Sequence, residues 1–354
     1  MKILYIGPQM LHPRNGGDRI ELRNQKLLER YSNAQLDYFS PDFRYTSLRS
    51  KLRLGIGVTN SKLKELRQKL SANDYDFAFV SQSLYGSYVK FIKNTAQIPV
   101  ITFFHNAEID YFSYLCNKKK LTGLYYLLKV LRSEQLCTKL SDMVITLNER
   151  DSAALGQHYK RCADFILPTS FKDNYEEPQS PIPKDIDYLF LGSCFAPNTE
   201  GVQWFIDQVM PHISGTLYII GNNMDTYPFK HLSERIHVIG FVEDIAEYYH
   251  RSKVVISPIY SGSGMKTKTA EALMYGKTIV GTQEAFEGYI INPECMKLCN
   301  TAEEFIKVLQ DITNNKNYDN RNAARLHFKK YYSDESVYQL LADFLKQSCT
   351  FLIK

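Results

Sequence analysis

A stretch rich in glycine and lysine near residue 265 holds the residue types that can bind a phosphate group. Between an apolar run and a helical pattern, the chain carries Gly262, Gly264, Lys266 and Lys268. Glycine lets the backbone approach a ligand closely, and the free N–H groups at a helix start favour an anion. Glu271, one helical turn further on, offers a carboxylate that accepts hydrogen bonds from sugar hydroxyls. The stretch predicts a site for a nucleotide or nucleotide sugar, although a surface turn before a lysine-rich helix would show the same residues.

The spacing within this stretch differs from that of two common phosphate-binding motifs. It lacks the G-x-x-x-x-G-K-[ST] spacing of a P-loop, and it is not G-x-G-x-x-G either. The residues that would hold the phosphates of ATP in a P-loop enzyme are therefore missing at this position.

The elements expected around the stretch are a strand, a glycine turn, a helix and a second strand. The helix is expected over Thr267–Tyr275, with Gly276 as its cap. The other strands are expected over 2–7, 34–39, 77–80, 99–104, 143–147, 187–192, 217–220, 237–239 and 253–257. The other helices are expected over 18–31 with Asp18 as N-cap, 62–70, 85–93, 124–140, 198–213, 243–250 and 335–345. This alternation predicts an α/β fold of parallel sheets covered by helices.

The length of 354 residues predicts two domains, because it exceeds the usual size of a single core. The segment 168–185 contains four prolines and no apolar periodicity, so it is the expected linker between domains at 1–167 and 186–332. Ligands of open parallel sheets bind at the carboxyl ends of the strands. If the sheets face each other, Gly16 and Gly17 in one domain and the stretch 262–268 in the other would border an interdomain cleft.

No apolar run approaches the roughly 18 residues of a membrane span, and the N-terminal apolar run is too short for a secretory signal. A cytoplasmic location is therefore expected. The seven cysteines are scattered and include no C-x-x-C pair. This pattern is typical of reduced thiols and argues against a zinc site or a disulfide framework.

Two basic segments hold much of the net charge of +5. One lies within 44–69 and the other within 118–132, where the lysines alternate with leucines and tyrosines. Such a pattern can rest on an anionic membrane surface, and it is equally typical of a solvated face over a buried apolar one. Nucleic acid is not among the expected partners.

In the order and spacing of its motifs, the chain resembles the GT-B glycosyltransferases of the large retaining family 4 over nearly its whole length. The residues that carry the resemblance are Gly16-Gly17, His105-Asn-Ala-Glu108, Ser141–Thr146, Phe190–Ser193 with Pro197-Asn198, Gly240–Asp244, Ser257–Gly276 and Glu287-Gly288. The resemblance implies two Rossmann-like domains facing a cleft. It also implies that the C-terminal helix, over 333–354, crosses back onto the first domain.

The resemblance also implies roles for single residues in the second domain. Glu271 is implied to bind the ribose of the donor, while Ser263 stands where the family has a glutamate that contacts the donor sugar. The arginine and lysine that usually follow the strand ending at Gly192 are absent, so Lys266 and Lys268 are the expected catalytic cations on the diphosphate. The backbone contacts to donor are expected from Gly192, Gly262, Ser263, Gly264, Met265 and Thr267.

In the first domain, the resemblance implies that His105 meets the donor sugar near the reacting carbon. Asn106 and Glu108 are expected near the sugar or the acceptor, and Gly16 and Gly17 near the diphosphate. From the residues alone, a structural histidine, an acid at a helix N-terminus and a plain tight turn are also compatible with these positions.

The implied function is transfer of a sugar, with retention at the anomeric carbon, from a nucleoside diphosphate sugar to a hydroxyl group. The leaving diphosphate itself would help to deprotonate the acceptor, so neither a protein nucleophile nor a metal nor a cofactor is expected. The acceptor would be a glycan, a lipid-linked molecule or a protein in bacterial surface polysaccharide or glycoconjugate synthesis. The alternatives are a non-catalytic GT-B protein that binds nucleotide sugars or glycans, and a nonhydrolysing sugar epimerase. The cytoplasm and the inner face of the cell membrane are the expected locations.

Overall fold

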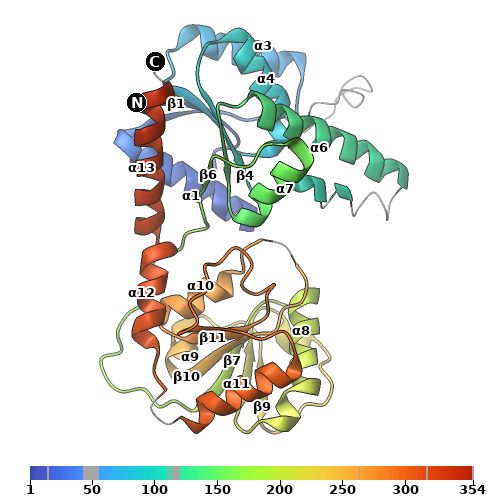
Figure 1. The fold of residues 1–354 in the computed structure, drawn as a ribbon, viewed down its shortest axis with the longest axis vertical. Helices are drawn as coiled ribbons and strands as arrows, with labels where there is room; N and C mark the ends of the chain where they lie inside the picture. Colours follow the sequence, from blue (N-terminus) through green and yellow to red (C-terminus); the bar gives the residue numbers. More distant parts are fainter. Residues whose placement is uncertain are drawn as a thin grey trace. The chain divides into compact units, whose positions relative to one another are not determined.

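The computed structural model describes residues 1–13, 16–42, 56–110, 112–113, 120–262, 264–315 and 318–352. The chain divides into two compact units, one made of Met1–Thr169 with Tyr338–Lys354 and the other of Ser170–Val337. Figure 1 shows that each unit is built on its own sheet with helices packed on both faces. The predicted α/β class with two parallel sheets is confirmed.

The first unit contains a six-stranded parallel sheet with the strand order β2-β1-β3-β4-β5-β6. Its strands are β1 (Lys2–Ile6), β2 (Gln35–Phe39), β3 (Phe77–Val80), β4 (Val100–Phe104), β5 (Met143–Thr146) and β6 (Phe165–Ile166). Its helices are α1 (Gly16–Arg30), α3 (Asn60–Ala72), α4 (Gly86–Thr95), α6 (Lys120–Leu140) and α7 (Glu149–Tyr159), with 3-10 turns over Tyr31–Asn33 and Ser83–Tyr85. β3 and β4 are buried along their whole length, as expected for central strands covered on both faces.

The second unit contains another six-stranded parallel sheet, with the order β12-β11-β10-β7-β8-β9. Its strands are β7 (Ile186–Leu191), β8 (Leu217–Ile220), β9 (Ile236–Ile239), β10 (Ser252–Ser257), β11 (Thr278–Gly281) and β12 (Met296–Leu298). Its helices are α8 (Ala196–Gln208), α9 (Ile245–Arg251), α10 (Thr267–Met274), α11 (Ala302–Asn314) and α12 (Arg321–Tyr331), with 3-10 turns over Met210–His212 and Met224–Thr226. This is the strand order of a dinucleotide-binding sheet.

The last helix, α13 (Asp334–Leu352), begins in the second unit and packs on the first. Leu341 and Leu345 are buried, and the Phe344 ring stacks on Phe165 of β6 at a centroid distance of 4.2 Å. The Arg30 guanidinium lies 3.7 Å from the centroid of the Tyr338 ring. The buried apolar residues of α13 thus pack within the first unit.

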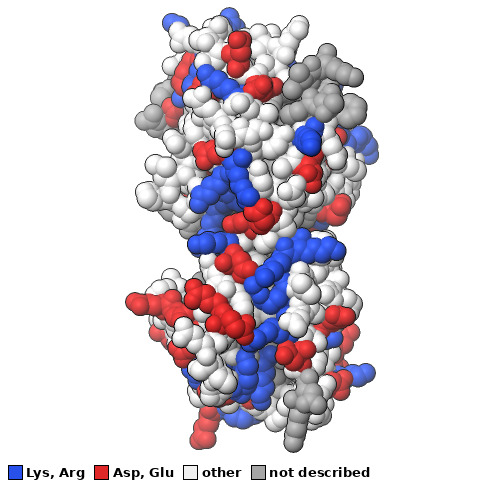
Figure 2. Space-filling model, turned by 90° about the vertical axis from the view of Figure 1, so that its left-hand side faces the viewer, with Lys and Arg blue, Asp and Glu red and all other residues white. Residues whose placement is uncertain are grey.

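Ion pairs join the segment after Thr169 to α12. Figure 2 shows Lys and Arg side chains gathered on the face of the second unit that carries α12, interspersed with Asp and Glu. Arg325 pairs with Asp173 at 2.8 Å, and Arg321 pairs with Glu177 at 2.6 Å. The expected linker spans 168–185, and from Ser170 onward this segment belongs to the second unit.

Three local predictions differ from the structure. α1 begins at Gly16, so Asp18 lies in its first turn and is not the N-cap. α7 was not predicted, because only two alanines, one leucine and the terminal Tyr159 are apolar among its 11 residues. The short strands β6 and β12 were not predicted either, since two or three residues show no periodicity.

No helix among the described residues is long and apolar enough to cross a bilayer.

Candidate functional site

The second sheet reverses its strand order between β7 and β10, which are neighbours in the sheet although far apart in sequence. The connections after these two strands leave toward opposite faces, which opens a crevice at their carboxyl ends where ligands of such sheets bind. Gly192 follows β7, and the predicted glycine and lysine stretch follows β10. The topology thus brings these two predicted parts of the site together.

Lys268, in the first turn of α10, reaches the end of β7. Its side chain is 8% exposed, and its Nζ donates a 2.6 Å hydrogen bond to Oδ1 of Asn198 on α8. The ammonium also lies 4.1 Å from the centroid of the Phe190 ring. Burial lowers the pKa of Lys268 to about 7, an effect that Glu271 opposes and Lys266 increases. Among the described residues no carboxylate forms an ion pair with it, so this cation is placed to meet an anion.

Gly192 leaves the room that the Lys268 side chain occupies. A Cβ atom at this position would lie 3.0 Å from Lys268 Nζ and 2.9 Å from Asn198 Nδ2. The Asn198 amide also donates a 2.9 Å hydrogen bond to the Ser193 carbonyl, which fixes its oxygen toward the lysine. Glycine is therefore favoured directly after β7, because a side chain at this position would crowd Lys268 and Asn198.

Lys266, which precedes α10, already has an acidic partner. Its Nζ lies 2.6 Å from Oε1 of Glu284 and donates to the Gly264 carbonyl at 2.9 Å. Its own carbonyl accepts a 2.7 Å hydrogen bond from the Tyr289 hydroxyl. Of the two predicted cations, Lys266 shapes the loop and Lys268 is the one without a paired carboxylate in the described chain.

The loop before α10 requires glycine at two positions. Gly262 has φ +139° and Gly264 has φ +67°, conformations that side chains rarely adopt. Lys266 caps α10 without a side-chain hydrogen bond, and the Thr269 N–H donates to the Lys266 carbonyl at 3.0 Å, so the N–H of Thr267 is the one placed to meet a ligand. Met265 packs against the core of the unit. Ser263 lies outside the described residues.

Glu271 lies one turn further along α10, on the same side as Lys268. Its Oε2 accepts a hydrogen bond of 3.4 Å from the Tyr249 hydroxyl of α9, and the Tyr249 ring stacks on Tyr275 at 4.5 Å. Tyr249 itself is completely buried, whereas Glu271 keeps part of its surface accessible. The Glu271 carboxylate is thus held by the Tyr249 hydroxyl, and part of the residue remains accessible to a ligand.

In the first unit, His105 follows β4 and lies against a buried carboxylate. Its Nε2 is 3.5 Å from Oε2 of Glu21 on α1, and the other Glu21 oxygen accepts a 2.9 Å hydrogen bond from the Tyr5 hydroxyl. His105 is 9% exposed and Glu21 1%. The ring also meets Phe103 edge-on at 5.4 Å. Glu21 was not predicted, because nothing in its helical pattern distinguishes it from a solvated acid.

Further buried polar atoms surround this pair at the carboxyl ends of the first sheet. Within the described chain, the Asn24 amide and the Ser81 hydroxyl have no hydrogen-bond partner. Gly7 leaves them space, since a Cβ there would lie 2.3 Å from Ser81 Oγ and 2.7 Å from Glu21 Oε1. Groups of this kind are usually satisfied by water or by a ligand.

The remaining predicted residues of the first unit lie at helix starts. Gly16 and Gly17 form the first turn of α1. Glu108 begins a short helical segment, and its N–H donates a 2.8 Å hydrogen bond to Glu134. Burial raises the pKa of Glu108, while Asn106 and His105 oppose the shift.

Two Asp-x-Asp sequences occur in the chain, at Asp74–Asp76 and Asp185–Asp187. Both lie just before or at the start of a strand, opposite the carboxyl ends described above. Asp185 pairs with Arg251 at 2.6 Å and Asp187 with Lys253 at 2.7 Å. The carboxylates of Asp185 and Asp187 are thus engaged in ion pairs, at the opposite end of the strands from the candidate site.

Two residues that position the second-unit site had not been assigned to it from the sequence. Asn198 had been recognised only as part of a motif, and Glu284 had not been singled out. Glu284 is 18 positions from Lys266, and only the return of the chain through β11 brings the two together.

Comparison with known proteins supports the observed fold. Residues 185–315 match the family described as glycosyl transferases group 1. The Anabaena protein HepE in complex with UDP is 13% identical, with a TM-score of 0.70, and the alignment covers 98% of this chain and 100% of that chain. The chain has the GT-B glycosyltransferase fold.

Other proteins with the GT-B fold align over the full length as well. Sucrose-phosphate synthase from Thermosynechococcus elongatus is 14% identical, with a TM-score of 0.66 and 99% of both chains covered. WaaG, a glycosyltransferase involved in lipopolysaccharide biosynthesis, is 14% identical, with a TM-score of 0.59 and 99% of both chains covered. No curated protein sequence gives a significant match. The GT-B fold implied by the resemblance is confirmed, and the match over 185–315 agrees with a glycosyltransferase family in the second unit.

Proposed function

We propose that this protein is a glycosyltransferase that moves a sugar from a nucleoside diphosphate sugar to an acceptor hydroxyl. The observation that carries the proposal is Lys268, a buried cation without a paired carboxylate in the described chain, at the carboxyl end of β7. The match of residues 185–315 to group 1 glycosyl transferases supports it, as do the HepE complexes with UDP and with UDP-glucose.

In this proposal, Lys268 binds the diphosphate and stabilises the charge that develops as the sugar departs. An ammonium held in a dry site stabilises such charge more strongly than one in water. The N–H groups at the start of α10 add to the same field. Lys266, neutralised by Glu284, holds the loop at Gly262 and Gly264 in shape.

Retention at the anomeric carbon follows from the resemblance and belongs to the proposal. The leaving diphosphate accepts the acceptor proton on the face where the sugar bond breaks, so the chain supplies position and charge and no nucleophile. Metal independence is proposed on the same ground. Glu271 is the proposed ligand of the ribose, with His105, Gly16 and Gly17 contributing from the first unit.

The main test is donor binding and turnover by a Lys268→Met variant. A thermal-shift screen of UDP-, GDP-, ADP- and dTDP-sugars first finds the donor, because a ligand that binds only the folded state raises its apparent stability. Lys268→Met is then expected to lose most turnover while Lys297→Met, a lysine of β12, retains it. Equal activity of the two variants would refute the role of Lys268.

Glu271→Ala tests the ribose contact separately. It is expected to weaken donor binding by about 1–3 kcal/mol, the scale of a lost hydrogen bond to a charged group. Calorimetry with the nucleoside diphosphate measures this directly. Nucleotide affinity equal to that of the wild type would remove Glu271 from the donor site.

The reaction products separate this function from its rivals. A glycosyltransferase releases nucleoside diphosphate when donor and acceptor are present. A protein that only binds nucleotide sugars releases none, and an epimerase converts the donor into another nucleotide sugar without acceptor. Product analysis by chromatography therefore decides among the three.

We further propose a role in bacterial surface polysaccharide synthesis, at the inner face of the membrane. The N-terminal half of α6 exposes Leu124, Tyr126 and Leu128, each between 46% and 48%. Exposed apolar side chains on a helix with basic neighbours are typical of a membrane-surface contact. The acceptor is proposed to be a glycan, a lipid-linked molecule or a protein.

Sedimentation with anionic vesicles tests the membrane contact. Leu124→Ser/Leu128→Ser is expected to lower binding, whereas Leu326→Ser, which changes a leucine 68% exposed on α12, is expected to leave it unchanged. Absence of salt-sensitive binding by the wild type would show that the basic segments are solvated surface.

A further inference from the structure

A cavity lies at the other end of the strands that carry the proposed donor site. Its volume is about 570 Å³, within the range of small-molecule sites. It is lined where β7, β10 and β11 begin, and by residues between α11 and α12. Since the donor site is at the carboxyl ends of β7 and β10, the cavity and the donor site are at opposite edges of one sheet.

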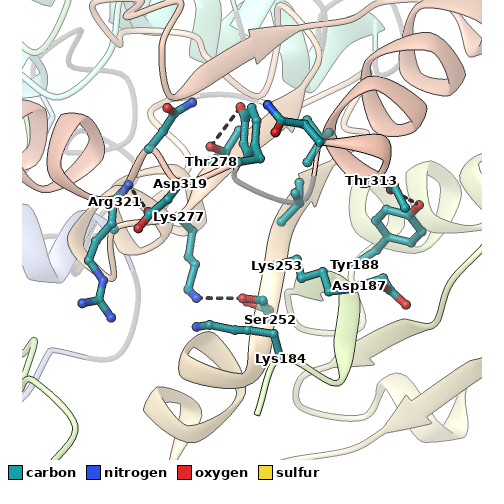
Figure 3. A pocket seen from close by; sticks show the side chains of 16 residues that line it. Lys184, Asp187, Tyr188, Ser252, Lys253, Lys277, Thr278, Thr313, Asp319 and Arg321 are labelled. Atoms are coloured by element: carbon teal, nitrogen blue, oxygen red, sulfur yellow. Dashed lines mark hydrogen bonds and ion pairs between the residues drawn. The ribbon is translucent and has the colours of Figure 1, made fainter. Parts of the chain in front are cut away.

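Two lysines from separate segments converge at this cavity. Figure 3 shows that the side chains of Lys184 and Lys277 point toward the same place beside Ser252. The Nζ of Lys277 donates a 2.7 Å hydrogen bond to the Ser252 carbonyl, and that of Lys184 donates to the His250 carbonyl. Lys277 is 7% exposed, whereas Lys184 is accessible at the rim.

Neither ammonium has a carboxylate partner among the described residues, although acids are close by. The carbonyl groups accept hydrogen bonds but carry no net charge. Asp187 pairs with Lys253 at 2.7 Å, and Glu177 pairs with Arg321 at 2.6 Å. Asp319 accepts a 2.9 Å hydrogen bond from the Arg321 N–H. The acids therefore serve other partners, and the Lys184 and Lys277 side chains lie side by side without an acid paired to either.

Burial and the neighbouring cations disfavour the charged forms of Lys277 and His250. Burial, together with the neighbouring Lys184 and Arg321, lowers the pKa of Lys277 to about 6, while Asp319 opposes the shift. Burial also lowers the pKa of His250, followed by the effect of Lys277, Lys184 and Arg321. An anion between the lysines would relieve the repulsion.

We propose that this cavity binds a small phosphorylated ligand, whose phosphate oxygens accept hydrogen bonds from both Lys184 and Lys277. A dianion matches two ammonium groups in charge, and hydrogen bonds between ions of opposite charge are the strong ones. Tyr188 and Tyr318 also line the cavity and would lie beside the remainder of the ligand. The site does not depend on the proposed donor site, because no residue is shared.

Calorimetric titration with inorganic phosphate, sulfate and glycerol phosphate tests the site. The wild type is expected to bind all three, and glycerol not at all. Lys184→Met and Lys277→Met are each expected to weaken binding about tenfold or more, as for a lost charge-assisted contact. Lys253→Met is the matched control, because it removes a lysine of the same cavity that is already paired with Asp187; its affinity is expected to stay unchanged.

Four results would overturn the proposal. The first is unchanged affinity in Lys184→Met, whose accessible side chain can be removed without opening the core. The second is an equal loss in Lys253→Met, which would indicate only general attraction. The third is loss of phosphate binding in Lys268→Met but not in Lys184→Met, which would place the anion in the donor site. Binding to phosphatidic acid vesicles that depends on Lys184, without binding of glycerol phosphate, would contradict a soluble ligand.

Discussion

At the residue scale, the most informative group is the Lys268 ammonium, because its protonation couples to its ligand. Burial lowers its pKa to about 7, so above that pH the free protein holds it mostly as a neutral amine. A bound diphosphate favours the charged form and raises the pKa again. Binding therefore takes up a proton when the pH is above 7.

We accordingly predict that the affinity for a nucleoside diphosphate falls as the pH rises above 7. The decrease approaches tenfold per pH unit until the pKa of the bound state is reached. Calorimetry in buffers of different ionisation enthalpy measures the proton uptake. Lys268→Met should show neither the uptake nor this pH dependence, and a wild-type affinity that is constant from pH 7 to 9 would contradict the prediction.

Also at this scale, Glu21 is predicted to act through His105. Its carboxylate lies 3.5 Å from the imidazole Nε2 and is held by Tyr5. Glu21→Gln keeps the side-chain size but removes the negative charge, so we expect kcat to fall about tenfold with little change in nucleotide Kd. A merely structural role would instead lower the thermal stability and leave kcat of the folded fraction unchanged.

At the element scale, the sequence alone predicted the long helices and strands whose apolar residues recur with a clear period. It also predicted glycines that the local backbone conformation requires. The helix after Lys266 was predicted within one residue, because an apolar stripe and Gly276, with φ +67°, mark its end. Contacts between elements were not predictable in this way. Lys266 meets Glu284, and His105 meets Glu21, only because separate connections return to the same sheet edge.

The end of β7 provides the prediction at this scale. Gly192→Ala places a Cβ where it would lie 3.0 Å from Lys268 Nζ, so the ammonium or Asn198 must move. We expect weaker nucleotide binding, by about tenfold, because a displaced charge loses its contact. Thermal denaturation should show a folded protein. An unchanged Kd would show that Gly192 does not determine the position of the Lys268 ammonium.

At the scale of the whole molecule, the chain is two sheets with separate cores and one helix that belongs to both. α13 begins in the second unit, and its buried residues complete the first. Leu341 is 1% exposed, whereas its neighbour Leu340 is 41% exposed. Substituting each of these two leucines in turn therefore distinguishes a loss of core packing from a change in helix formation.

We predict that Leu341→Ala lowers the free energy of unfolding of the first unit by about 2–5 kcal/mol, the cost of a large-to-small change in a core. Leu340→Ala should cost far less, because it removes little buried surface. Calorimetric unfolding measures both, and nucleotide affinity at a temperature where both variants are folded should be unchanged, since no predicted donor ligand lies on α13. Equal destabilisation by the two variants would show that α13 stabilises the protein through its helix alone and not through its apolar stripe.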